Sequence, residues 1–164
     1  MAEQSAKVVQ RCEDAKGSKR LMLNECDLSK FPDAVFLLIK GVTLESVDLS
    51  RNVLKKVHTQ LGIKFATITS LDLSYNQLGS LPDSLRSLVR LEALNLSHNQ
   101  FNSYPSVLPQ VNSLQSVDLS HNSIAEVSPD ELAPLASINL SHNPLTDDTK
   151  LVLRSVVRVN ISIN

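Results

Sequence analysis

The chain contains no tryptophan, only four glycines and only two cysteines in its 164 residues. With so few glycines, the sequence lacks the glycine-rich loop that cradles nucleotide phosphates. The two cysteines, Cys12 and Cys26, are too few for a disulfide framework, so we expect both to be buried thiols. These absences exclude phosphate-loop enzymes and small disulfide-rich secreted proteins.

Long hydrophobic runs and an excess of one charge are also missing. No uninterrupted apolar stretch reaches the roughly 18 residues of a membrane span, and the N-terminal segment has no signal-peptide core. The 16 basic and 17 acidic residues leave a formal net charge of −1, which gives no broad electrostatic footprint for nucleic acid or anionic membrane. We therefore expect a cytoplasmic protein with neither nucleic acid nor membrane as a partner.

What the chain has instead is one motif repeated along its length. Its clearest copy, residues 44–54, alternates apolar and polar positions around Val47 and Leu49 and then reaches Asn52. The same pattern recurs at residues 68–78, 91–101, 114–124 and 135–145. A weaker copy comes earlier, with Cys26 in place of the asparagine. An incomplete seventh copy ends at Asn164, which we assign to its asparagine position.

The alternation in each copy predicts a short strand with one buried face. Segments such as residues 81–88 follow the strands; they contain a proline near their start and then apolar residues at three- and four-residue spacing. This arrangement favours a short helical or irregular return. Because no single copy can bury its own leucines, the copies must stack. One buried row should comprise Leu49, Leu73, Leu96, Leu119 and Leu140.

The repeated motif resembles that of the leucine-rich repeat family, in its intracellular type with units of about 23 residues. A Leu-Pro step after the strand is typical of that type, and Phe31-Pro32, Leu81-Pro82 and Tyr104-Pro105 carry it here. The resemblance covers residues 18–164. It implies an α/β fold, a curved solenoid with a parallel β-sheet on its concave side, with about six complete repeats and a truncated seventh. It also implies a role in protein contacts.

The asparagine position has a structural interpretation. A side-chain amide offers two donors and one acceptor, so it can satisfy backbone groups that a turn leaves in the interior. We expect a structural ladder of Cys26, Asn52, Asn76, Asn99, Asn122 and Asn143.

Both ends of a stacked solenoid expose an apolar cross-section. At the N-terminal end, residues 1–17 predict a capping helix, with Ser5 as its N-cap and Gly17 as the residue that ends it. Residues 18–164 then form the solenoid, and the whole chain is one domain. At the other end, the strand with Val159 and Ile161 has no capping segment after it. Either the sequence is a truncated form, or this edge contacts another molecule, for which self-association is one route.

The polar positions of the strands should face outward on the concave sheet as rows. Two rows consist of small residues, one of them Ser50, Ser74, Ser97, Ser120, Ser141 and Ser162. The middle row is Asp48, Asp72, Asn95, Asp118, Asn139 and Asn160. Neighbouring acids at Asp48 and Asp72 repel each other, which either a basic partner segment or water and Arg51 would relieve. Aromatic and arginine anchors on this face are Tyr75 and Arg51 alone.

His98, His121 and His142 occupy one motif position in consecutive copies and should form a row beside the strands. A straight row of parallel imidazoles converges poorly on the tetrahedral geometry of zinc, so we expect no metal and no cofactor. A pH-responsive row and a row of solvated residues copied with the repeat are the other interpretations. The expected partner-binding surface therefore comprises Arg51, Asp48, Asp72, Tyr75, Asn95, His98, Asp118, His121, Asn139 and His142.

Catalysis needs unlike groups that converge at one place, whereas this chain presents like groups in rows. We expect no enzymatic activity and favour a non-catalytic module that binds an unidentified partner protein on its concave face. The alternative is a structural or regulatory subunit that uses its convex loops or its open C-terminal edge.

Overall fold

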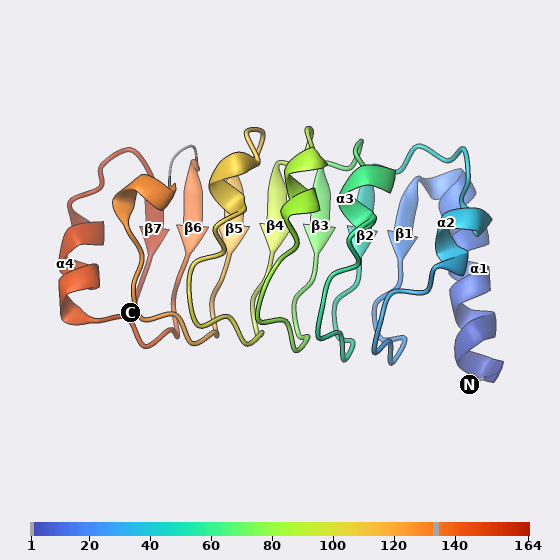
Figure 1. Ribbon diagram of the computed structural model, residues 1–164, viewed down its shortest axis with the longest axis horizontal. Coiled ribbons are helices and arrows are strands. Elements are labelled where there is room, and N and C mark those ends of the chain that lie inside the picture. Colours follow the sequence, from blue (N-terminus) through green and yellow to red (C-terminus); the bar gives the residue numbers. More distant parts are fainter. Residues whose placement is uncertain (1, 133–134) are drawn as a thin grey trace.

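The computed structural model describes residues 2–132 and 135–164. In these residues, seven short strands form a single parallel sheet in which every strand pairs with the next one along the chain. The strands are β1 (Arg20–Met22), β2 (Ser46–Asp48), β3 (Ser70–Asp72), β4 (Ala93–Asn95), β5 (Ser116–Asp118), β6 (Ser137–Asn139) and β7 (Asn160–Ser162). Figure 1 shows them side by side along the long axis of the molecule. The predicted α/β solenoid with a parallel sheet is confirmed.

Short helical segments return the chain from each strand to the next and lie on one side of the sheet, in front of the strands in Figure 1. They are α2 (Ala34–Leu38), α3 (Leu61–Lys64), η1 (Asp83–Ser87), η2 (Leu108–Gln110), η3 (Pro129–Leu132) and α4 (Asp147–Arg154), where η denotes a 3₁₀ helix. The backbones of α3 and η1 approach so closely that a Cβ atom on Gly62 would lie 2.1 Å from the carbonyl oxygen of Ser84. Glycine is therefore required at this contact.

The core is one continuous stack of apolar side chains between the sheet and the returns. Its central row lies between 0% and 1% exposed and consists of Leu49, Leu73, Leu96, Leu119 and Leu140. Each leucine packs in the same position of its turn, because equivalent residues of β2 to β6 pair in register. Each turn thus buries the apolar face of its neighbour.

Helix α1 (Ala2–Ser18) lies beside β1 and buries Val8, Cys12 and Ala15 against the core. Its polar side chains also reach the first turn. The Gln4 amide donates to the Cys26 carbonyl at 2.6 Å, and the Arg11 guanidinium donates to the side-chain oxygen of Asn24 at 2.6 Å. In the first turn these carbonyl groups have no preceding repeat to supply hydrogen-bond donors, and the side chains of α1 supply them instead.

The predicted limits of this helix are wrong at both ends. Ser5 lies within α1 and is not its N-cap, because the helix already begins at Ala2. Gly17 is also helical, and the left-handed residue that follows the helix is Lys19, with a φ of 58°. The Lys19 amide still donates to the Ala15 carbonyl at 2.9 Å. A non-glycine residue in this conformation thus closes the helix.

The seventh repeat is displaced by two residues from its predicted alignment. Strand β7 pairs Ser162, rather than Asn160, with Asn139 of β6. A shift of two residues preserves the alternation of buried and exposed positions, so the hydrophobic pattern alone does not distinguish the two registers. Asn164 therefore lies two positions before the ladder position to which the sequence pattern assigned it.

Candidate partner-binding surface

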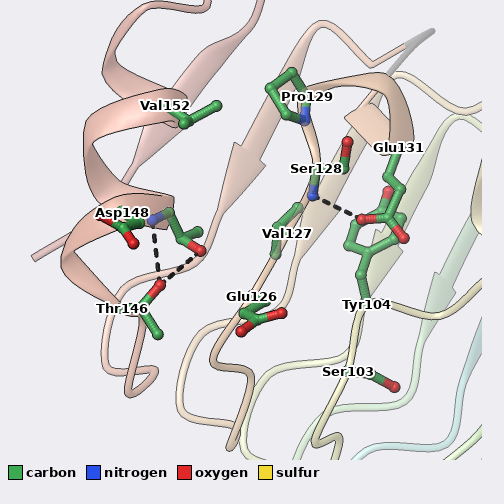
Figure 2. Close-up of a pocket in the computed structure, with 11 residues that line it drawn as sticks. Ser103, Tyr104, Glu126, Val127, Ser128, Pro129, Glu131, Thr146, Asp148 and Val152 are labelled. Carbon is green, nitrogen blue, oxygen red and sulfur yellow. Dashed lines mark hydrogen bonds between the residues drawn. The ribbon is translucent and has the colours of Figure 1, made fainter.

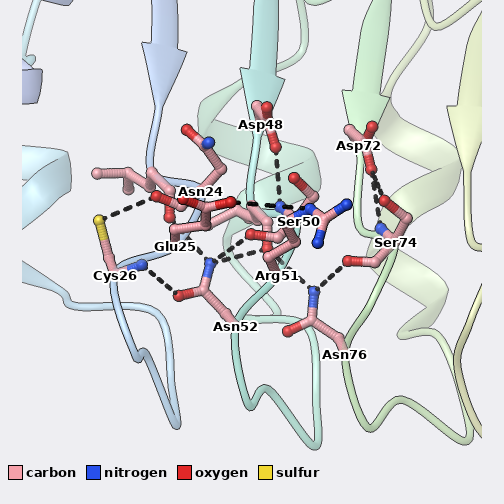
Figure 3. A network of polar contacts seen from close by, with 12 residues as sticks. Asn24, Glu25, Cys26, Asp48, Ser50, Arg51, Asn52, Asp72, Ser74 and Asn76 are labelled. Carbon is pink, nitrogen blue, oxygen red and sulfur yellow. Dashed lines mark hydrogen bonds and ion pairs between the residues drawn. The ribbon is translucent and has the colours of Figure 1, made fainter.

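Side-chain amides link each turn of the solenoid to the one before it (Figure 3). The Asn76 amide nitrogen donates to the carbonyls of Leu49 and Leu73, both at 3.0 Å, and to that of Ser74 at 3.1 Å. The Asn76 amide oxygen accepts from the backbone N–H of Leu54 at 3.0 Å. Equivalent bonds are made by Asn52, Asn99, Asn122 and Asn143. This ladder holds the strands at a fixed spacing.

Cys26 takes part in the ladder mainly through its backbone. Its N–H donates to the Asn52 amide oxygen at 3.1 Å, and its thiol approaches the Asn24 carbonyl of the same turn at 3.4 Å. Among the described residues, the thiol has no hydrogen bond to α1. Burial, and next the charge of Glu13, raise the pKa of the other cysteine, Cys12, which favours its neutral thiol.

The residue before each ladder position has a left-handed backbone. Its φ lies between 53° and 57° at Glu25, Arg51, Tyr75, His98, His121 and His142. Non-glycine residues seldom adopt this conformation, although histidine does so more readily than most. Because the same backbone geometry recurs at each turn, these side chains leave the solenoid in parallel.

The parallel side chains form a continuous stacked column. The ring centroids of Tyr75 and His98, of His98 and His121, and of His121 and His142 are each 4.0 Å apart, with interplanar angles between 11° and 18°. The Arg51 guanidinium lies 4.5 Å from the Tyr75 ring centroid, as in a cation–π contact. We call these five residues, Arg51, Tyr75, His98, His121 and His142, the stacked column.

An acid–amide row runs along the strands beside the column. It consists of Asp48, Asp72, Asn95, Asp118 and Asn139, all of them partly exposed. The Asn95 amide donates to Asp72 and the Asn139 amide donates to Asp118, each at 3.2 Å. A depression of about 170 Å³ lies over β3 to β5 and includes Asp72, Asn95 and Asp118 in its lining. Two of the three acids thus already have an amide neighbour.

Comparison with known proteins agrees with this architecture. Residues 42–101 match the profile of the Leucine rich repeat family, and residues 113–135 match a second Leucine Rich Repeat profile. Together the two matches cover just over half of the chain.

The chain belongs to the leucine-rich repeat family.

This leucine-rich repeat protein is also 30% identical over 97 residues to leucine-rich repeat-containing protein 20 of Homo sapiens. The alignment covers 57% of this chain and 53% of that relative, so it spans about half of the relative's length. Leucine-rich repeat domains generally mediate contacts between proteins and are typically non-catalytic. No helix among the described residues is both long and apolar enough to cross a membrane.

In this leucine-rich repeat protein, the prediction of an accessible serine row is wrong for four of its six members, whereas Ser141 is partly exposed and Ser162 is exposed. Ser50, Ser74, Ser97 and Ser120 are between 5% and 8% exposed. The Ser74 hydroxyl donates to Asp72 at 2.6 Å, and the Ser120 hydroxyl donates to Asp118 at 2.6 Å. Because these serines come two residues after the last residue of their strand, they turn back toward the middle row and orient its side chains.

Arg51 does not bond the neighbouring acids Asp48 and Asp72, whose repulsion it was expected to relieve. Its ion pair is with Glu25, at 3.8 Å, and its guanidinium stacks on Tyr75. Serine and asparagine, rather than Arg51, donate to the carboxylate of Asp72.

The histidines of the leucine-rich repeat protein stack face to face, which disfavours a shared metal ion. Rings 4.0 Å apart and nearly parallel cannot direct their lone pairs at one tetrahedral centre. In the described part of the chain, no group of three or more His, Cys, Asp or Glu side chains is placed to hold a metal.

Stacking should make stability depend on pH through His121. Loss of water around the ring, and next the charges of His98 and His142, lower the pKa of His121, while Asp118 opposes the shift. The unfolded chain then binds a proton more readily than the folded chain. The contribution of His121 to stability is therefore complete above the ordinary histidine pKa of about 6.5 and is lost as the pH falls below it.

We predict that a His121→Asn variant, which keeps a residue tolerant of positive φ, loses less stability than wild type between pH 7.5 and pH 5.5. Urea unfolding at both pH values measures this difference. Equal losses in the two proteins would show that the folded environment does not lower the pKa of His121.

Proposed function

We propose that this leucine-rich repeat protein binds a partner protein on its concave face, through the stacked column and the acid–amide row. The observation that carries this proposal is the column itself, because interface energy concentrates in aromatic and arginine side chains. Tyr75 is 42% exposed although both of its faces contact a neighbouring side chain. The edge of the Tyr75 ring is therefore both ordered and accessible to a partner.

Rigidity favours affinity at such a surface. The side chains of the column are already ordered by stacking, and the amide ladder fixes the strands beneath them. A partner therefore loses little free energy to the ordering of this surface.

Charge specifies the kind of segment that fits. Asp48 and Asp72 lie side by side in the register of β2 and β3. Asp48 accepts from the Ser50 amide at 2.8 Å, whereas Asp72 also receives the Asn95 amide. Met22, 42% exposed, lies opposite Asp48 on β1. A partner segment with a basic residue beside an apolar one matches this end of the face, and we place the centre of the interface at Arg51, Tyr75, Asp72 and Asn95.

The alternative, binding through the outer loops, is favoured by three exposed apolar side chains. Leu37, Ile63 and Val89 are between 61% and 77% exposed and belong to the returns or to the turns beside them. A structural or regulatory subunit would use these residues and leave the concave face free.

A double variant tests the proposal. Arg51 and Tyr75 both have φ near +54°, so each is replaced by asparagine, which tolerates that backbone better than alanine. Partners are first identified by affinity purification with the wild-type chain and then purified for titration. We expect Arg51→Asn with Tyr75→Asn to weaken binding at least about tenfold, as expected for the loss of two anchors.

The matched control is Ile63→Ala with Arg86→Ala, which removes one apolar and one arginine side chain from the outer face. This control should bind as wild type does. Unchanged affinity of the Arg51 and Tyr75 variant, with loss of binding in the control, would place the interface on the outer loops instead.

A further inference from the structure

Tyr104 places a hydroxyl where the repeat has apolar side chains. Its equivalents after the strands of the other turns include Phe31, Val57, Leu81 and Val127. Tyr104 is 5% exposed, and its hydroxyl has no hydrogen-bond partner among the described residues. Buried hydroxyls are normally paired, and the repeat itself needs no hydroxyl here, so this group is a candidate contact for a ligand.

The ring of Tyr104 borders a hollow near the C-terminal end of the solenoid, with a volume of about 630 Å³. Figure 2 shows Tyr104 and Glu131 on one side and Thr146, Asp148 and Val152 of the α4 region on the other, with the segment Val127–Pro129 between them in this view. The hollow is thus built from three successive turns, and it is separate from the acid–amide row.

The charge of this hollow is negative. Glu126, Glu131 and Asp148 line it, and none of the three forms an ion pair with another described residue. One oxygen of Glu131 accepts from the Ser128 amide at 2.8 Å, which holds the carboxylate in place and leaves its second oxygen for a ligand.

The N-terminus of α4 does not make the hollow an anion site. Thr146 caps the helix by accepting from the Thr149 amide at 3.2 Å, and the first turn already carries Asp147 and Asp148. Burial, and next the charge of Glu131, raise the pKa of Tyr104, so its hydroxyl stays protonated. The hollow therefore offers carboxylates and a neutral hydroxyl, with apolar walls at Val127, Pro129 and Val152.

We propose that this hollow binds a basic segment of a partner polypeptide, with a lysine or arginine side chain inserted between α4 and Glu131. The aliphatic stem lies on Val127 and Val152, and the cationic head contacts Glu131 and Asp148. The Tyr104 hydroxyl oxygen is enclosed, so the side chains around it must shift before it accepts a hydrogen bond from the head, which then removes its unpaired state. This site is independent of the concave face and would give the protein a second point of contact.

The probe is an acetylated Gly-Arg-Arg amide peptide, titrated into the isotope-labelled protein and followed by NMR. Its matched control replaces both arginines with citrulline, which has the same shape without the charge, and butylguanidinium tests whether a free small cation suffices. We expect the arginine peptide to shift the amide resonances of residues 126–131 and 146–152. The citrulline peptide should bind at least about tenfold more weakly. Butylguanidinium binding as tightly as the peptide would overturn the polypeptide segment as the ligand.

Two variants assign the contacts. Glu131→Gln with Asp148→Asn should weaken the arginine peptide at least about tenfold, whereas Asp83→Asn with Glu92→Gln, which removes two acids elsewhere, should leave binding unchanged. Tyr104→Phe should weaken binding several-fold while leaving the unfolding midpoint equal or higher, because it removes an unpaired buried hydroxyl. Equal binding of the citrulline peptide, or a Tyr104→Phe variant that is less stable but binds normally, would overturn the proposal.

Discussion

Replacing Leu96 with alanine is expected to lower the free energy of unfolding by about 2–5 kcal/mol. Leu96 is 0% exposed and lies in the central row between Leu73 and Leu119, so the substitution opens a cavity that both adjoining turns must share. Each turn of a solenoid is stabilised by its neighbours, and a defect in the middle weakens two interfaces at once. Urea unfolding followed by circular dichroism measures the loss.

The control for this prediction is Val89→Ala, which also shortens an apolar side chain but at a position that is 70% exposed. Its free energy of unfolding should change by less than about 0.5 kcal/mol. Similar losses in the two variants would contradict a core in which the leucine row carries the stacking.

Replacing Asn76 with alanine is expected to cost about 1–3 kcal/mol, because the Leu54 N–H loses its partner, whereas the carbonyls of Leu49, Leu73 and Ser74 each keep a second donor. The Asn76 side chain is 8% exposed and bonds three carbonyls and the Leu54 amide, so water cannot reach these groups without opening the turn. The loss should appear in urea unfolding.

Hydrogen exchange gives the same variant a local readout. The Leu54 amide should exchange faster in Asn76→Ala, whereas the Leu49 amide, which donates to the Asp72 carbonyl at 2.8 Å, should keep most of its protection. The control is Asn102→Ala, at an exposed asparagine outside the ladder. An Asn76→Ala variant as stable as this control would contradict the structural role of the ladder.

The sequence pattern was sufficient to predict the solenoid, because each copy of the motif repeats both the strand alternation and the asparagine. It was not sufficient to align the seventh repeat. A two-residue slip leaves Ile161 on the buried side in either register, so only the pairing of β7 with β6 identifies Ser162 as the neighbour of Asn139. The end of α1 was also predicted at the wrong residue. Lys19 follows the helix with a positive φ, a conformation that a sequence-based prediction expects at glycine.

The sequence predicted a row of histidines but not the geometry of that row. The motif position of His98, His121 and His142 indicated a row, yet the positive φ that turns these side chains into a stack is not encoded in hydrophobic periodicity. The preference of histidine for such a backbone was the available signal. Ser74 and Ser120 looked accessible in the alternation, but they follow the strand and bond its acids.

The repeat pattern in the sequence contains no indication of the acidic hollow. In the Leu-Pro step Tyr104 takes the place of leucine, which explains its burial but not its hydroxyl. The carboxylates of Glu131 and Asp148 come from different turns, and their approach depends on where α4 lies relative to η3. Only the folded chain shows that these groups share one hollow.

Carboxyl footprinting of the purified complex tests the central claim, that a partner docks on the concave face, most directly. A carbodiimide with glycine ethyl ester labels accessible carboxylates, and the extent of labelling is read by mass spectrometry with and without the partner. We predict that labelling of Asp48 and Asp72 falls several-fold in the complex, while Asp83 on the outer face is labelled equally in both states. Protection of Asp83 with unchanged labelling of Asp48 and Asp72 would contradict the account.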